Sequence, residues 1–268
     1  MNGIPLADTR SRTAGTPHHA LVDQTPHRNV TNHVSSCSDS VVTIATAYWQ
    51  TTLYACSLLL MCACLALPFD VSLAQLFEAE ITPGELRAIF SRAEFFGHAY
   101  GVIGIAVTIW ILDPQRRARI GQFVLAALGA GLAADGIKLL VWRIRPCHSN
   151  WNVDDGSISM AFFHYQSGEW DSLLESANHS FPSAHTAVAF AAAMVLAKFY
   201  PQARSWFWTL AIFVLMNRID GGAHYLSDVF CGGVVGLVAA TAVLRSRAYW
   251  RIPNAIRMFR PSLGPADA

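Results

Sequence analysis

The chain has 268 residues and a formal net charge of +1; hydrophobic residues make up 53% of it and charged residues only 14%. Soluble globular domains carry about 25% charged residues, so this composition argues against a soluble globule. The net charge by itself indicates no class of partner, and we expect a protein of the membrane bilayer with no nucleic-acid partner.

Residues 1–40 are rich in Thr, Ser, His, Asn and Pro and show no hydrophobic period, which predicts a disordered cytoplasmic tail. We interpret the histidines of this tail as bystanders and not as metal ligands. No charged segment precedes a short apolar run with a small-residue cleavage site, so the first apolar stretch is expected to be a retained span and not a cleaved signal.

Six apolar stretches then follow, at residues 42–69, 95–112, 120–142, 183–199, 206–216 and 227–244. About 20 helical residues cross the hydrocarbon core of a bilayer, and only the fifth stretch is clearly short. We therefore predict an all-α fold, an integral membrane bundle of six transmembrane helices over residues 41–245. A basic cytoplasmic tail is expected over residues 246–268.

The charged residues between these stretches predict the orientation. Arginine and lysine gather in the connections 113–119 and 198–205 and after residue 244, whereas the connection 70–94 is acidic. By the positive-inside rule, both termini are cytoplasmic, and the connections after the first, third and fifth spans face outward. We expect a multi-pass protein of the inner (plasma) membrane.

Two pairs of glycines stand four residues apart in the apolar stretches, Gly97 with Gly101 and Gly232 with Gly236. Small residues at this spacing let membrane helices approach closely, so we predict helix packing at both pairs. His98 is interpreted as a core histidine with satisfied hydrogen bonds. The spacing of the six cysteines indicates neither a disulfide framework nor a zinc site.

The third stretch ends with four charged residues, Asp135, Lys138, Arg143 and Arg145, followed by Pro146. Charges at a membrane boundary are costly unless they are paired. One interpretation is an Asp135–Lys138 ion pair with arginines that extend to the interface. The other is that Lys138 and Arg145, two helical turns apart, reach one outward-facing point.

A second polar cluster opens the fourth stretch. The outer connection 147–180 carries aromatic and acidic residues and is expected to form a lid or interfacial segment. Pro182 and Ser183 then mark a helix N-terminus, whose free N–H groups favour an anion. Ser183 offers a hydroxyl and His185 a proton, although a capped helix start would explain the same residues.

The third cluster lies between the fifth and sixth stretches, where Arg218, His224 and Asp228 have the spacing R-x5-H-x3-D. On a helix, His224 and Asp228 share one face. A carboxylate that holds the Nδ1–H group leaves Nε2 free as a nucleophile or base, although a capped helix start is again the alternative. All three clusters are predicted on the outer face of the membrane, where they combine cations with two histidines.

Together the clusters resemble the signature of the type 2 phosphatidic acid phosphatase (PAP2) family, K-x6-R-P, P-S-G-H and S-R-x5-H-x3-D. Here the three parts begin at Lys138, Pro182 and Asn217, and the resemblance covers roughly residues 135–236. Ala184 replaces the glycine of the family pattern, and Asn217 replaces its serine.

The resemblance implies a metal-independent and cofactor-free lipid phosphatase with a phosphohistidine intermediate. In it His224 attacks phosphorus, Asp228 orients His224, and His185 protonates the leaving oxygen and then activates water. The residues expected to hold the phosphate are Lys138, Arg145, Ser183, Ala184 and Arg218.

Several alternatives stay open at this point. A lipid phosphotransferase would use the same intermediate, and vanadium haloperoxidases share the signature but lack the membrane spans. A transporter of anionic lipids would distribute its charges through the membrane depth. The sequence names neither the oligomeric state nor the lipid; phosphatidic acid, phosphatidylglycerol phosphate, undecaprenyl diphosphate and lipid A phosphates all fit.

Overall fold

The structure is a computed structural model that describes residues 49–151, 156–160 and 175–246. All of these belong to one compact unit, Thr46–Ala268. The predicted N-terminal tail, all but one residue of the predicted C-terminal tail, and much of the expected outer lid lie outside the described residues.

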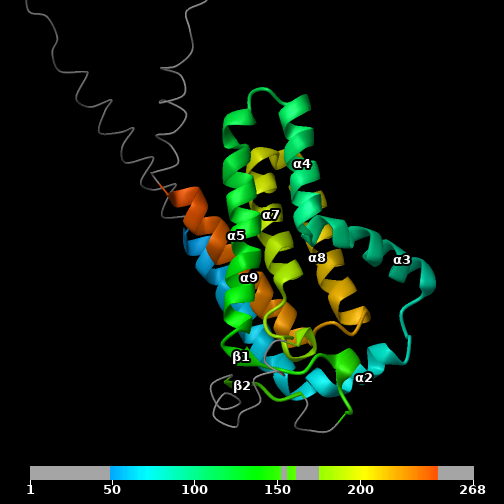
Figure 1. Ribbon diagram of the computed structural model, residues 1–268. Helices are drawn as coiled ribbons and strands as arrows, with labels where there is room; N and C mark the ends of the chain where they lie inside the picture. The colour runs from blue at the N-terminus through cyan, green and yellow to red at the C-terminus, as the bar shows by residue number, and fades with distance from the viewer. Residues whose placement is uncertain (1–48, 152–155, 161–174, 247–268) are drawn as a thin grey trace, which may run out of the picture. The chain divides into compact units, whose positions relative to one another are not determined.

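The described chain is mostly helical (Figure 1). A helix over residues 49–66 runs through a 3-10 turn, Leu67–Phe69, into α2. The remaining helices are α2 (Asp70–Glu78), α3 (Gly84–Ala93), α4 (Ala99–Leu112), α5 (Ile120–Lys138), α7 (Ala184–Phe199), α8 (Arg204–Asp220) and α9 (Leu226–Arg245). Two short antiparallel strands, β1 (Val141–Trp142) and β2 (Ser159–Met160), pair Val141 with Met160.

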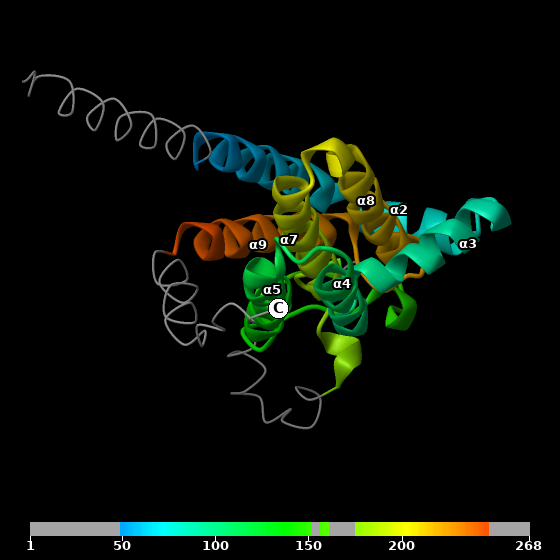
Figure 2. The ribbon, with the colours of Figure 1, turned by 90° about the horizontal axis from the view of Figure 1, so that it is seen from above.

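Helix α7 is the centre of the packing, and it lies against α5, α8 and α9 (Figure 2). Its sequence is rich in alanine, and every residue from Thr186 to Leu196 is buried. Small side chains let three helices approach α7 at once, because each neighbour can come close to its backbone. The N-terminus of α7 is therefore held firmly in the bundle.

Glycines make the closest of these contacts. A Cβ added at Gly232 would lie 2.4 Å from the carbonyl oxygen of Ser183, and one at Gly236 would lie 2.4 Å from that of Ala187. The predicted packing at this pair is thus confirmed between α9 and α7. A Cβ at Gly97 would lie 2.7 Å from the carbonyl oxygen of His185, whereas Gly101 faces Phe95 of its own segment.

Three helices of the described chain are long and apolar enough to cross a membrane: Trp49–Glu78, Arg117–Lys138 and Leu226–Arg245. A fourth span is possible if Gly84–Gly97 and Ala99–Leu112, bent by 71°, count as one. Helix α7 is apolar but has only 16 residues, fewer than the roughly 20 that a span needs. Membrane character is therefore evident, while the number of six spans stays a prediction.

Two predicted boundaries differ from the structure. The third stretch was expected to run to residue 142, but α5 ends at Lys138 and the chain continues into β1. Leu139 and Leu140 extend the apolar run without extending the helix, since hydropathy does not distinguish a helix from a strand. The acidic connection 70–94 is also largely helical, because it contains α2 and α3.

Candidate active site

Backbone hydrogen bonds join the three polar clusters at one end of the bundle. The N–H groups of Arg143 and Arg145 donate to the carbonyl oxygens of Asn178 and Ala177, at 3.1 and 2.8 Å. The N–H of Ser183 donates to the carbonyl oxygen of Asp228 at 3.1 Å. The chain after α5, the start of α7 and the α8–α9 connection therefore form one site.

His224 lies in the α8–α9 connection and is only 2% exposed. Its Nδ1 is 2.6 Å from the carbonyl oxygen of Ser180, which can only accept, so Nδ1 carries the hydrogen. In the neutral ring Nε2 then keeps its lone pair. Burial, together with the positive charges of Lys138 and Arg145, lowers the pKa of His224 well below its ordinary value and favours the neutral ring.

Asp228 does not hold His224 directly. Its Oδ2 is 3.9 Å from Nδ1, beyond hydrogen-bond distance, and accepts instead from the Ser180 hydroxyl at 2.5 Å and the Tyr225 N–H at 2.9 Å. Asp228 is the third residue of α9 and closes a capping box with Tyr225, which turns its carboxylate back toward the helix start. Asp228 thus positions Ser180, whose carbonyl oxygen holds His224. The capped helix start, which was the alternative interpretation of these residues, is present as well.

Arg143 has a role that the sequence did not reveal. It is 1% exposed, so the interpretation of an arginine extending to the interface is wrong for this residue. Its guanidinium donates to Asp70 at 2.7 Å, to Ser227 at 2.8 Å, to Asp228, and to the carbonyl oxygen of Gly156 at 2.9 Å.

The guanidinium of Arg143 also lies over the ring of Tyr225, with 4.1 Å between Cζ and the ring centroid. A buried ion pair of this kind is strongly destabilising to break, since one charge is left without a partner. Arg143 therefore fixes Asp228 and joins α2 to α9. The only sequence signal was a pair of acids, Asp70 and Asp228, at the ends of two apolar stretches.

The predicted cations gather around His224. Lys138 forms the predicted ion pair with Asp135 at 3.0 Å, and Lys138, Arg145 and Arg218 all act on the His224 ring electrostatically. The Nε–H groups of Arg145 and Arg218 are buried and have no hydrogen-bond partner among the described residues. Buried donors without an acceptor are costly, so these two N–H groups suit a bound anion.

Ser183 and Ala184 stand at the start of α7. The Ser183 hydroxyl is fully buried and accepts from the Thr186 N–H at 3.4 Å and from the Thr186 hydroxyl at 3.0 Å. It therefore caps the helix and keeps its own hydrogen as a donor. Ala184 is the first residue of α7, where a backbone N–H has no partner within the helix.

His185 faces a carboxylate that the sequence did not place in the site. Its Nε2 is 3.7 Å from Oε1 of Glu94, and the same oxygen accepts from Nη2 of Arg218 at 3.0 Å. His98 lies edge-on to His185 with ring centroids 5.2 Å apart. The Nδ1 of His98 is buried and has no hydrogen-bond partner among the described residues, so the predicted hydrogen bonding of this histidine is not complete there.

Comparison with known proteins places these residues in a family. Residues 119–252, half of the chain, match the PAP2 superfamily. The chain belongs to the PAP2 superfamily. The match includes all eight predicted site residues, which the PAP2 fold brings to one end of the bundle.

Two relatives illustrate the similarity. A lipid A 1-phosphatase of Rhizobium johnstonii is 34% identical over 140 residues, 49% of this chain and 52% of the relative. A lipid A 1-phosphatase of Rhizobium etli is 36% identical over 107 residues, 40% of this chain and 41% of the relative. The chain thus matches about half the length of these relatives, or less.

The crystal structure of Aquifex aeolicus LpxE shares the fold, with a TM-score of 0.50 at 20% identity; the match covers 66% of this chain and 96% of that one.

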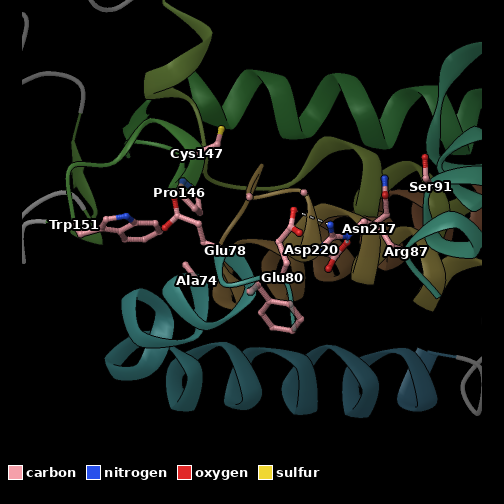
Figure 3. A pocket seen from close by; sticks show the side chains of 13 residues that line it. Ala74, Glu78, Glu80, Arg87, Ser91, Pro146, Cys147, Trp151, Asn217 and Asp220 are labelled. Atoms are coloured by element: carbon pink, nitrogen blue, oxygen red, sulfur yellow. Dashed lines mark hydrogen bonds and ion pairs between the residues drawn. The ribbon is translucent and has the colours of Figure 1, made fainter. Parts of the chain in front are cut away.

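A cavity of about 450 Å³ is lined by two positions of the PAP2 signature, Pro146 and Asn217, and by none of the eight predicted site residues (Figure 3). Its walls come from α2, α3, the end of α8 and the segment after Arg145. Inside it, Arg87 binds Asp220 at 3.0 Å and Glu80 at 3.1 Å. Asn217, the residue that replaces the serine of the signature, also lines this cavity.

Proposed function

We propose that the protein hydrolyses a phosphate ester of a membrane lipid, without a metal ion, through a phosphohistidine on His224. The observation that carries the proposal is the buried ring of His224, which is fixed through Nδ1 by the Ser180 carbonyl beside three cations. This arrangement keeps Nε2 unprotonated and places it where positive charge stabilises a phosphate.

In the first step, Nε2 of His224 attacks phosphorus and an N–P bond forms. The P–O bond to the lipid breaks, its electron pair leaves with the lipid oxygen, and that oxygen takes a proton from protonated His185. The charge that develops on the phosphoryl oxygens is balanced by Lys138, Arg145 and Arg218 and by the donors at the start of α7.

In the second step, water attacks the phosphohistidine. The water gives a proton to neutral His185, its oxygen bonds to phosphorus, and the N–P bond breaks with its electron pair returning to Nε2 of His224. Phosphate leaves and both histidines regain their starting states. His185 stands in the first turn of α7, beside the free N–H groups that hold the phosphate.

The membrane helices and the two relatives support the substrate class. Both relatives are named lipid A 1-phosphatases, which supports a phosphorylated lipid whose phosphate lies at the membrane boundary. The site is formed at the C-terminal ends of α5 and α8 and the N-terminal ends of α7 and α9, so it lies at one end of the bundle. We assign this end to the outward face of the plasma membrane, in a bundle of six spans with both termini cytoplasmic.

Phosphate release by detergent-purified protein tests the proposal. The panel is phosphatidic acid, phosphatidylglycerol phosphate, undecaprenyl diphosphate and lipid A, each with EDTA present. We expect release from at least one lipid at a rate that EDTA does not change, because cations of the protein balance the charge. Loss of turnover in EDTA with recovery in Mg²⁺ would contradict the mechanism.

The intermediate is tested separately by an alkaline quench with radiolabelled substrate. We expect label on the wild-type protein, no label on His224→Ala, and a fall in activity of at least about 10⁴-fold in that variant. His148→Ala is the matched control, because His148 is exposed just beyond the site. Label retained on His224→Ala would assign the nucleophile to another residue.

A further inference from the structure

Glu94 is a carboxylate among the cations of the phosphate site. It begins the 3-10 turn Glu94–Gly97 between α3 and α4. Its Oε1 lies 3.0 Å from Nη2 of Arg218 and 3.7 Å from Nε2 of His185, and its Oε2 accepts from the Asn217 amide at 3.2 Å. One acid therefore contacts a phosphate-binding arginine and the proposed general acid.

The position of Glu94 is fixed from two sides. Gly97, at the end of the same turn, packs so closely on α7 that a Cβ there would lie 2.7 Å from the His185 carbonyl oxygen. Asn217 holds the other carboxylate oxygen, and Asn217 is one of the two positions where this chain departs from the PAP2 signature. The asparagine side chain is longer than that of serine and ends in an N–H donor. Asn217 can therefore reach the Glu94 carboxylate.

Glu94 does not fill the phosphate site. Arg218 has five N–H donors, and its Nε–H is buried with no partner among the described residues while Nη2 binds Glu94. The phosphate therefore has its own donor on Arg218. Glu94 instead lies 3.7 Å from Nε2 of His185, the group that protonates the leaving oxygen in the proposed mechanism.

The cavity next to Asn217 is also acidic. Asn217, which binds Glu94, also lines the cavity of Figure 3, and Ser91, one helical turn before Glu94, lines it too. That cavity contains the carboxylates of Glu78, Glu80 and Asp220 and one guanidinium, Arg87. Oδ1 of Asp220 is buried with no partner among the described residues, so it can accept a hydrogen bond.

We propose that Glu94 determines specificity, by selecting lipid phosphate monoesters, whose leaving group is a neutral alcohol, over lipid diphosphates. This inference rests on the proposed function. The reacting bond is a P–O bond in both substrate types. Its electron pair leaves on an alcohol oxygen in the monoester and on a phosphate oxygen in the diphosphate. A carboxylate next to the general acid accepts a hydrogen bond from the departing alcohol and repels a departing phosphate.

Glu94 also favours hydrolysis of the monoester through its effect on His185. An alkoxide is a poor leaving group and needs the proton of His185, whereas a departing phosphate is stable without it. The carboxylate at 3.7 Å partly offsets the effect of the Arg218 charge on the protonated ring of His185. Removing the charge of Glu94 should therefore slow hydrolysis of the monoester and relieve the repulsion of the phosphate that leaves from the diphosphate. Both effects lower the preference for the monoester.

The test compares kcat/KM for phosphatidic acid and undecaprenyl diphosphate, measured on detergent-purified full-length protein. In Glu94→Gln we expect the monoester-to-diphosphate ratio to fall by at least about tenfold. Glu94→Asp keeps the charge and should keep the preference for the monoester. Glu85→Gln, an exposed acid on α3, is the matched control and should leave the ratio unchanged.

Asn217→Ser gives an independent variant, because it restores the residue of the family pattern and removes the amide that holds Glu94. We expect the ratio to fall in the same direction by a smaller factor. A purely structural role for Glu94 would lower kcat/KM for both lipids equally, and an unchanged ratio in Glu94→Gln and Asn217→Ser overturns the inference. Wild-type protein that releases phosphate from no lipid of the panel refutes the proposed function itself.

Discussion

At the scale of single residues, one set of groups holds the proposed nucleophile, His224, and another surrounds it with positive charge. Ser180 holds His224 by its carbonyl oxygen, and Asp228 acts on Ser180 and the start of α9. A carbonyl oxygen fixes the tautomer of His224 without a full negative charge next to the ring. A carboxylate in the same place would favour the charged imidazolium, which is not a nucleophile.

The lowered pKa of His224 predicts the acid limb of the pH profile. Because the pKa lies below its ordinary value, His224 stays neutral as the pH falls through that value, and the nucleophile is lost only at lower pH. In Lys138→Gln one opposing positive charge is removed, so the pKa of His224 should rise and the acid limb of kcat/KM should move to higher pH. The maximum should also fall by about 10²-fold.

Lys198→Gln is the matched control, since Lys198 lies near the opposite end of α7 from His185. Ionisation of the substrate phosphate is the same in both variants, so a difference between them reports the enzyme. An acid limb that stays in place in Lys138→Gln would show that the charge of Lys138 does not act on His224.

At the scale of helices, the site depends on how closely α9 approaches the start of α7. Gly232 lies against the Ser183 carbonyl, and the Ser183 N–H donates to the Asp228 carbonyl oxygen. The same approach therefore brings the second and third signature clusters together. Arg143 adds the segment after α5, since it binds Asp70 of α2 and Asp228 of α9.

Gly232→Ala tests this approach. The new Cβ would lie 2.4 Å from a backbone oxygen, so α9 must shift, and we expect a loss of about 1–3 kcal/mol in the free energy of unfolding. The lipid phosphatase rate should fall with it. Thermal unfolding in detergent and kcat/KM measure the two effects.

Gly129→Ala in α5 is the control, because nothing lies within 4 Å of its added Cβ. This change should be neutral or slightly stabilising, since alanine favours a helix more than glycine does. Equal stability of the two variants would contradict the close approach of α9 to α7.

At the scale of the whole molecule, the polar site and the basic connection 113–119 stand at opposite ends of α5. The positive-inside rule then predicts that the site faces outward. Cys147 offers a probe of this topology, because it is a free and exposed cysteine two residues after Arg145.

In a variant that retains Cys147 as its sole cysteine, we expect reaction with a membrane-impermeant thiol reagent in intact cells. A cysteine at Gln115, introduced into a cysteine-free chain, should react only after the cells are opened, since residue 115 belongs to the basic connection. The reverse pattern would place the chemistry on the cytoplasmic face.

The sequence alone determined the membrane character, the signature residues and their common end of the bundle. These depend on local rules: hydropathy along a helix, the preferences of a helix start, and the fixed spacing of R-x5-H-x3-D within one connection. Family membership rests on the same spacing, and the match over residues 119–252 confirms it.

Only the tertiary structure decided which groups meet across long stretches of chain. Asp70 with Arg143, and Glu94 with Arg218, are 73 and 124 residues apart, as their numbers show. Ser180 takes the place at Nδ1 that the i,i+4 spacing had predicted for Asp228. Sequence spacing fixes what two residues can reach along one helix, whereas the partner that satisfies a buried charge depends on which helices pack together.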